Sequence, residues 1–267
     1  MSYDASAENL RCPYCASERL EKQTDSRGIS PARMIAFRVN QASAQQAVRA
    51  WLGRGFWRPS DLASSARISK IVAVYVPYWV FSANTHTYWT ADSGNTPFGA
   101  RADWYPVSGD HRDEYRGIIV GASSSLTPAE TNQLCPFDLA QAIPADLREL
   151  EFANVERFTV PRKYARPMAR QGLEEHERQA ISRSYLPGRH RNLKANVLIE
   201  DLHSEPIVLP VWIMAYRYRD QLYRILVNGQ SGKVFGQAPF SYAKAIIVGI
   251  IVFILTLIVA GVFLASQ

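Results

Sequence analysis

The chain has 267 residues, of which 47% are hydrophobic and 20% are charged, and its formal net charge is +6. This composition excludes a disordered or fibrous protein and supplies enough apolar material for one or two folded domains. The basic residues are spread along the chain without a long Lys/Arg run. The positive charge therefore suits an anionic membrane surface at least as well as a nucleic acid.

Two of the three cysteines, Cys12 and Cys15, stand close together near the N-terminus. An odd number of cysteines with one short spacing argues against a secreted disulfide framework and favours a reducing compartment. The first ten residues are polar, with neither the apolar core of a signal peptide nor the arginine-rich pattern of a transit peptide. We therefore expect no export signal at this end.

The first elements in chain order are a short cysteine knuckle with a polar linker, residues 1–33, and a short strand over 34–39. A helix is expected next, because Ser43 and Gln46 form a capping-box pair and Gly53 ends the apolar pattern. One face of this helix is apolar, as its residues at i, i+3, i+4, i+7 and i+8 show: Ala44, Ala47, Val48, Trp51 and Leu52.

The segment 71–81, IVAVYVPYWVF, is β-branched and aromatic throughout and predicts a strand buried on both faces. Because Pro77 cannot donate to a strand ladder, it is expected at a bulge, an edge or a strand start. Further strands are expected between residues 82 and 115. The segments 76–83 and 209–216 share an apolar-Pro-apolar-Trp start. They represent either a duplicated strand unit whose copies pair in one sheet or a coincidence between two buried strands.

Helices are expected after Thr127, which precedes a proline and an acidic first turn, and over residues 167–185. Strands follow over 193–199, 207–218 and 222–227, and the turn at 228–232 leads into a last strand over 233–235. The pattern predicts an α+β fold over residues 34–240, an antiparallel, strand-rich cytosolic domain with about three helices.

Residues 245–265 read AIIVGIIVFILTLIVAGVFLA, without a charge or a proline. A helix of this length spans a hydrocarbon core of about 30 Å, so we expect a single, tail-anchored transmembrane helix that inserts after translation ends. Lys244 precedes this segment, and the positive-inside tendency predicts that the N-terminal domain is cytoplasmic. No Gly-x-x-x-Gly motif supports dimerisation through this helix, so homo-oligomerisation stays open.

Potential acid/base groups are densest at Asp110, His111, Asp113 and Glu114, with Asp92 and Asp103 nearby. Such a cluster fits either a hydrolytic site or a solvated loop. The basic stretch 183–191, RSYLPGRHR, would contact anionic lipid or nucleic acid, or is plain exposed charge. An aromatic surface for a protein partner is expected from Trp57, Trp89, Trp104 and Tyr105.

The final third of the chain resembles a bacterial family of zinc-ribbon proteins of uncharacterised function. The resemblance rests on LPVW at 209–212, YRY at 216–218 and VNGQSGKV at 227–234, together with Tyr75, Pro77 and Trp79 earlier in the chain. It covers most of the chain and is loose between residues 94 and 165. It implies a zinc-ribbon-like N-terminus and membrane association, and it carries no known catalytic residues. A helicase label sometimes given to members has no support, because the chain lacks a phosphate-binding loop.

A zinc ribbon needs four ligands, and this chain has one Cys-x-x-Cys knuckle in which Ala16 replaces the usual glycine. The candidate metal ligands are Cys12, Cys15 and, as a third ligand, Cys135. Alternatively, two chains would each contribute Cys12 and Cys15 to one zinc ion, or the knuckle is degenerate and binds no metal.

The preferred hypothesis is a non-enzymatic adaptor, held at the lipid bilayer and presenting its cytosolic domain to a protein partner. A zinc-knuckle nucleic-acid-binding protein held at the membrane is the first alternative. A hydrolase that uses the cluster near Asp110 is the second. The sequence contains none of the common nucleophile, zinc-protease or dinucleotide motifs that would favour an enzyme.

Overall fold

The structure is a computed structural model that describes residues 29–68, 71–95, 98–99, 103–151 and 153–265. The chain folds as two compact units. Of the described residues, 29–36 and 74–210 belong to the first unit, and 37–73 and 211–265 belong to the second. The residues expected to form one α+β domain, 34–240, are thus distributed over both units.

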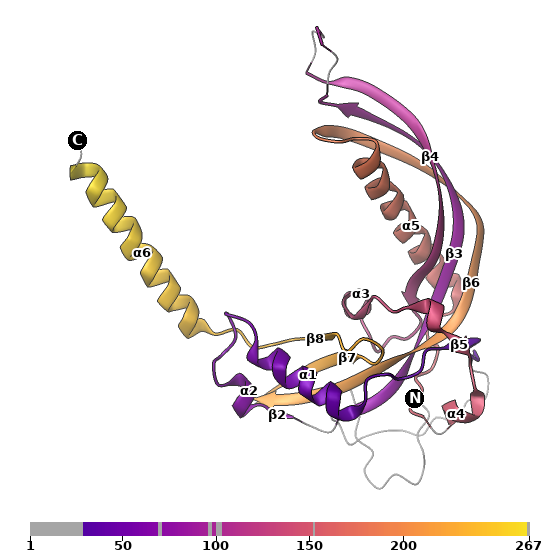
Figure 1. The fold of residues 1–267 in the computed structure, drawn as a ribbon, viewed down its shortest axis with the longest axis horizontal. Coiled ribbons are helices and arrows are strands. Elements are labelled where there is room, and N and C mark those ends of the chain that lie inside the picture. Colours follow the sequence, from indigo (N-terminus) through magenta and orange to yellow (C-terminus); the bar gives the residue numbers. More distant parts are fainter. Residues whose placement is uncertain (1–28, 69–70, 96–97, 100–102, 152, 266–267) are drawn as a thin grey trace. The chain divides into compact units, whose positions relative to one another are not determined.

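The first unit is built on long, curved strands (Figure 1). Strands β3 (Val72–Ser93) and β4 (Tyr105–Gly121) form an antiparallel hairpin, and β3 also neighbours β6 (His190–Tyr218). Two short strands, β1 (Arg33–Met34) and β5 (Ile143–Pro144), complete the order β4-β3-β6-β1-β5. The pairing of β1 with β6 is parallel, and that of β1 with β5 is antiparallel.

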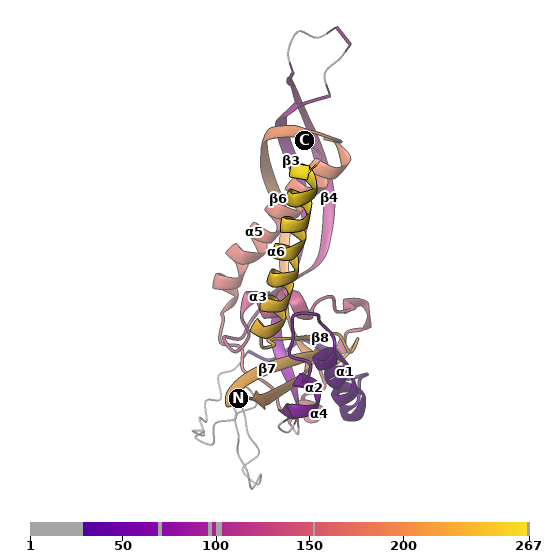
Figure 2. The same ribbon diagram turned by 90° about the vertical axis from the view of Figure 1, so that its left-hand side faces the viewer.

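Helix α5 (Arg162–Ser184) lies along the concave side of these strands (Figures 1 and 2). Its buried residues recur at every fourth position: Ala165, Ala169, Leu173, Glu177 and Ile181. Because a helix has 3.6 residues per turn, a stripe with this spacing winds slowly round the helix axis. The winding allows one straight helix to stay in contact with a twisted sheet.

Three short helical elements complete the first unit: α3 (Pro128–Leu134), the 3-10 helix η1 (Leu139–Gln141) and α4 (Leu147–Glu151). The expected helix start at Thr127 is confirmed. Its hydroxyl accepts a hydrogen bond from the Glu130 amide, and the Glu130 carboxylate accepts one from the Thr127 amide. This reciprocal capping box, with a proline at the first helical position, fixes where α3 begins.

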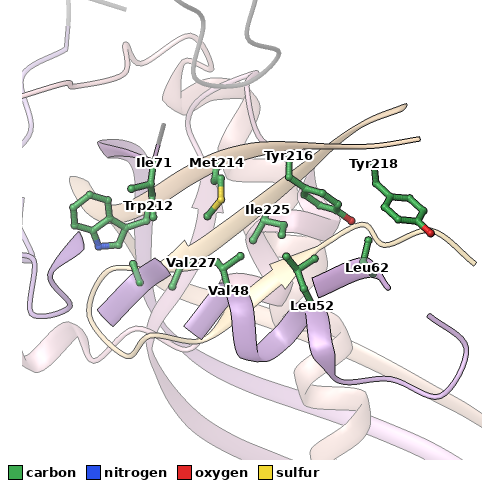
Figure 3. Close-up of a cluster of buried hydrophobic side chains, with 11 residues drawn as sticks. Val48, Leu52, Leu62, Ile71, Trp212, Met214, Tyr216, Tyr218, Ile225 and Val227 are labelled. Carbon is green, nitrogen blue, oxygen red and sulfur yellow. The ribbon is translucent and has the colours of Figure 1, made fainter. Parts of the chain in front are cut away.

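The second unit contains α1 (Gln41–Gly53), α2 (Leu62–Ser65), β2 (Arg67–Ile68), β7 (Gln221–Asn228) and β8 (Val234–Gly236). The C-terminal end of β6 pairs with β2 and with β7, and β7 pairs with β8. Figure 3 shows the core of this unit, in which side chains of α1 and α2 face those of β6 and β7. The buried cluster is Ala44, Val48, Leu52, Leu62, Ile71, Trp212, Met214, Tyr216, Tyr218, Ile225 and Val227.

The apolar face predicted for α1 is confirmed, since Ala44, Val48 and Leu52 are buried. The predicted capping box of Ser43 and Gln46 is wrong. The helix begins at Gln41, two residues before Ser43, because Asn40 is the N-cap, and the Asn40 side-chain oxygen accepts a hydrogen bond from the Ser43 amide at 2.8 Å. Asparagine caps a helix as well as serine does, so Asn40 can take this role in place of Ser43.

Helix α6 (Tyr242–Ala265) is long and apolar enough to cross a membrane. The 20 residues from Tyr242 to Gly261 form the candidate span, and none of it is buried against the rest of the protein. The Ser241 hydroxyl accepts a hydrogen bond from the Lys244 amide at 3.4 Å, which places Ser241 as the residue that caps the helix.

The α+β class and the strand-rich sheet are confirmed, but the expectation of about three helices is imprecise: five α-helices precede α6 in the part of the chain that the structure describes. The predicted strands 193–199 and 207–218 are one 29-residue strand, β6. Pro77 lies one residue before the pairing of β3 with β4 begins at Tyr78. The two Pro-x-Trp segments lie in β3 and β6, which are hydrogen-bonded neighbours.

Candidate functional site

A groove of about 1040 Å³ follows β4 in the first unit, bounded by α3 and α5. The strand supplies residues 115–121, and α5 supplies Met168, Gln171, Gly172, Glu175, His176 and Gln179. The apolar side chains of the lining come from several segments of the chain and include Ile118, Ile119, Val120, Leu126, Phe137, Val160 and Met168. The groove is thus an apolar trough with polar groups along its helical wall.

Strand β4 is an edge strand, since among the described strands it pairs with β3 alone. In an antiparallel pair, half of the backbone N–H and C=O groups of an edge strand point away from the partner strand. A groove that runs beside these groups can accept an additional strand. The side chains of such a strand would alternate between the apolar floor and solvent.

A β-bulge shapes the edge strand at the groove. Phe81 pairs with Ile118 and Ser82 pairs with Arg116, so Gly117 has no partner on β3. Gly117 has a φ of 93°, and a Cβ atom at this position would lie 2.8 Å from Leu139 Cδ1. Glycine is required here both for the backbone conformation and for the close approach of η1.

The polar wall of the groove carries an ordered set of charges on α5. Glu175 accepts hydrogen bonds from Gln179 Nε2 at 3.0 Å and from Arg178 Nη1 at 2.9 Å. The bond from Gln179, and next the one from Arg178, lower the pKa of Glu175 below its ordinary value. The ring of His176 lies 6.0 Å from the ring of Tyr115 across the strand–helix junction. This wall presents both signs of charge.

A buried carboxylate lies under α5, on the side that faces the sheet. Glu177 is fully buried, and its Oε1 accepts a hydrogen bond from the Thr85 hydroxyl. Its Oε2 has no hydrogen-bond partner among the described residues. Burial, and next the charge of Glu177, raise the pKa of the Tyr115 phenol. A polar interior of this kind lowers stability unless every group is satisfied.

The acidic cluster near Asp110 does not converge on one point. His111 contacts Tyr185 at the end of α5, whereas Asp110 contacts His86 at 3.3 Å among exposed side chains. Successive residues of a strand point to opposite faces, so Asp110 lies on the other face from His111 and Asp113, whose Nε2 and Oδ2 atoms are 3.9 Å apart. Asp92 is bonded to Arg191 and Asn192 elsewhere, and Asp103 is exposed.

Of the candidate metal ligands, Cys12 and Cys15 lie outside the described residues. Cys135 is the C-cap of α3 and lines the groove, as does His176. Within the described ranges no group of three or more His, Cys, Asp or Glu side chains could hold a metal ion.

The expected aromatic surface is only partly present. Trp89 is buried against Tyr185, with 5.5 Å between the ring centroids, so its predicted exposure is wrong. Trp57 and Tyr105 are exposed. Trp104 lies under the guanidinium groups of Arg189 and Arg191, at 5.5 and 4.4 Å from its ring centroid. Two arginines of the basic stretch 183–191 are thus already engaged within the fold.

The sequence did not indicate the groove itself. Its lining combines residues of one strand, two helices and the loops after them, and only their arrangement in space makes a binding surface. One local signal was available: Met168 is an exposed apolar residue on α5, outside the buried stripe.

Comparisons with known proteins place this chain beside one curated relative. The chain is 24% identical over 224 residues to "Uncharacterized protein YdjG" of Bacillus subtilis (strain 168). The match covers 81% of this chain and 66% of the relative, so the chain spans slightly less than two thirds of the relative's length. No family model matches the chain. No solved structure matches it either.

These findings correct the inferred membership of a zinc-ribbon family, which is wrong. No family model supports it, and the described residues offer no metal-binding group. The motifs of the final third have a structural explanation instead. Trp212, Tyr216, Tyr218 and Val227 are buried in the core of the second unit, and the Asn228 side chain accepts hydrogen bonds from the Gln230 and Ser231 amides in the turn after β7.

Proposed function

We propose that this protein is a membrane-tethered, non-enzymatic adaptor. In this proposal α6 crosses the bilayer once, the remainder of the described chain lies in the cytoplasm, and the groove along β4 binds an extended segment of a partner protein. The observation that carries the proposal is the apolar groove beside the edge strand, in a chain that also has a fully exposed apolar helix.

The properties of α6 support the tether. An α-helix of 24 residues is about 36 Å long, more than the hydrocarbon core of about 30 Å. Exposed apolar side chains surround it on every side, as the consecutive residues Ile251, Val252, Phe253 and Ile254 show. Such a surface is unstable in water and stable in lipid. Lys244 at its start favours a cytoplasmic N-terminal side.

The groove supports a peptide rather than a small ligand as the partner. An added strand would pair with the outward backbone groups of β4 between Tyr115 and Gly121, which gives affinity without a specific side chain. Selectivity would come from its apolar side chains, which would contact Ile119, Val120 and Met168. We therefore expect the partner segment to be extended, with apolar residues at alternate positions.

The arrangement of polar groups favours binding over catalysis. The Asp110 cluster is divided into two separate pairs, Asp110 with His86 and His111 with Asp113, and neither pair lines the groove. The groove wall contains Glu175 and His176, yet the Glu175 carboxylate is already bonded to Gln179 and Arg178.

Site-specific photo-crosslinking in the native host tests this proposal. A photoreactive residue at Met168, which is 43% exposed in the groove, should give one discrete crosslinked partner. Leu198 is the matched control position, because it is 45% exposed, belongs to the same unit and does not line the groove.

Affinity capture of that partner by a chain without the photoreactive residue should be lost in Met168→Asp, because a charge on the apolar wall would be buried by the peptide. Leu198→Asp should leave capture unchanged. Equal crosslinking from both positions, or capture that survives Met168→Asp, would show that the groove is not the binding surface.

A further inference from the structure

Four exposed aromatic side chains of the second unit form a continuous surface, here called the aromatic collar: Phe56, Trp57, Phe240 and Tyr242. Their exposed fractions are 64%, 44%, 49% and 76%. Phe56 packs on Trp57 with 5.0 Å between ring centroids, Trp57 stacks on Phe240 at 5.6 Å, and Phe240 meets Tyr242 at 5.4 Å. Large rings exposed side by side are unusual on a soluble surface.

The collar joins two segments that are far apart in the sequence. Phe56 and Trp57 lie in the loop between α1 and α2, whereas Phe240 and Tyr242 lie at the start of α6. The Ser241 amide donates a hydrogen bond to the Trp57 carbonyl oxygen at 2.8 Å, and Lys244 Nζ donates one to the Arg58 carbonyl oxygen at 2.8 Å. The loop is therefore fastened to the first turn of α6.

The same loop is held from its other side by α1. The Arg58 guanidinium lies 3.7 Å from the ring centroid of Trp51 and donates a hydrogen bond to the Trp51 carbonyl oxygen. Phe56 and Trp57 are thus exposed on a loop that is held in place by α1 and by the first turn of α6. Binding through these two rings would therefore cost little conformational entropy.

We propose that the aromatic collar lies in the interfacial layer of the lipid bilayer, so that the α1–α2 loop is a second membrane contact beside α6. This inference rests on the proposed membrane tether. If α6 crosses the bilayer, its apolar surface begins at Ile246, one turn after Tyr242. The collar then stands at the depth of the lipid headgroups, where tryptophan and tyrosine rings are enriched because they are apolar with one polar edge.

The occupant of this surface is lipid rather than a protein, because the collar is continuous with the exposed apolar face of α6. Ile246 and Ile247, both exposed, follow Tyr242 directly along the helix. A protein partner bound to the collar would compete with the bilayer for the same rings. Two attachment points on one unit also fix its rotation about the α6 axis, which a single helix cannot do.

Quenching of tryptophan fluorescence by brominated lipid tests the proposal in the full chain. The protein is reconstituted into liposomes of phosphatidylcholine with bromine either near the headgroup or near the end of the acyl chain. We expect the shallow bromine to quench the tryptophan fluorescence more than the deep one. In Trp57→Phe, most of this decrease in fluorescence should be absent. In the matched variant Trp104→Phe, in the first unit, brominated lipid should cause the same decrease in fluorescence as in the unmodified protein.

Flotation of the same liposomes separates this inference from the tether. Two results would contradict membrane contact by the collar while leaving the tether in place. In the first, the protein floats but Trp57→Phe is quenched as much as the unmodified protein. In the second, the protein floats but the deep bromine quenches more than the shallow one. The first of these results is also expected if a second copy of the protein, rather than lipid, covers the collar. Protein that does not float overturns both. Phe56→Ser, which keeps Trp57, should reduce the shallow quenching and serves as the second variant.

Discussion

The carboxylate of Asp61 is coupled to the core of the second unit through one hydrogen bond. The hydroxyl of Tyr218, itself buried, donates to Asp61 Oδ1 at 2.9 Å, and Arg219 Nη2 lies 3.6 Å from Asp61 Oδ2. The bond from Tyr218 is the main cause of a lowered pKa of Asp61. A carboxyl group whose pKa is lower in the folded state stabilises the fold when it is ionised.

The first prediction concerns this pH dependence. The stabilisation by Asp61 should be complete above the ordinary aspartate pKa of about 3.9 and should disappear as the pH falls through the lower pKa of the folded state. Chemical unfolding of the full chain in detergent, measured across this range, should show a stability advantage over Asp61→Asn at neutral pH that closes in acid. A gap that is the same at every pH would contradict the assignment.

The second prediction concerns Glu177. Because Glu177 is fully buried and its Oε2 has no partner within hydrogen-bond distance in the described part of the chain, replacement by leucine should raise the free energy of unfolding by about 1 kcal/mol, although it also removes the interaction with the Tyr115 phenol. Thr85 would remain bonded, since in this variant its one hydroxyl proton can be donated to the Asp113 carbonyl oxygen, which lies 3.2 Å away. Denaturant unfolding measures the change, and Leu173→Ala on the same stripe should instead cost about 2–5 kcal/mol. A less stable Glu177→Leu would mean that the carboxylate supports the fold.

Single residues also show where sequence reasoning ends. Thr85, Thr87 and Glu177 are polar, and nothing in their local pattern indicates burial, yet all three lie between α5 and the sheet. Trp89 was expected on the surface because its neighbours are polar. It is buried because alternation along β3 directs the odd-numbered residues 83–91 toward the helix side.

At the scale of elements, the bulge at Gly117 lies in the part of the edge strand β4 that lines the groove. The third prediction is that Gly117→Val destabilises the first unit by about 2 kcal/mol and weakens partner capture, because a side chain there meets Leu139 in a strained backbone conformation. Thermal unfolding and the Met168 crosslink measure the two effects. Unchanged stability would show that η1 can move aside.

Gly172 provides the contrasting case in the same groove. It lies inside α5, and a Cβ atom there would have its nearest contact, Ile118 Cγ2, at 3.9 Å. The fourth prediction is that Gly172→Ala stabilises the protein by about 0.5–1 kcal/mol, because alanine is the better helix former. The same thermal unfolding measures it. A loss of stability would mean that the wall of the groove is tighter than the structure shows.

Elements with a strong period were predictable and those without one were not. The apolar face of α1, the cap of α3 and the exposed apolar α6 follow from spacing and composition alone. The predicted break within β6 was wrong. Residues 200–206 are mostly polar and include Pro206, a composition typical of a loop. Pairing with neighbouring strands keeps this segment extended, although Asp201 adopts a φ of 50°.

At the scale of the whole molecule, one chain contains both the groove along β4 and the long apolar helix α6. The long apolar helix α6 could be predicted from sequence because an uncharged apolar run is a property of consecutive residues. The groove could not, because it exists only where α3 and α5 border β4. The partner's chemistry follows from the edge strand and the apolar lining rather than from any sequence motif.

The most direct test of the adaptor is the location of the crosslinked partner in cells with and without α6. With the intact chain, the partner identified through Met168 should be recovered in the membrane fraction. With a chain ending at Ser241 it should become soluble, and replacement of α6 by an unrelated single-spanning helix should return it to the membrane. A partner that stays at the membrane without α6, or that never requires the groove, would contradict the account.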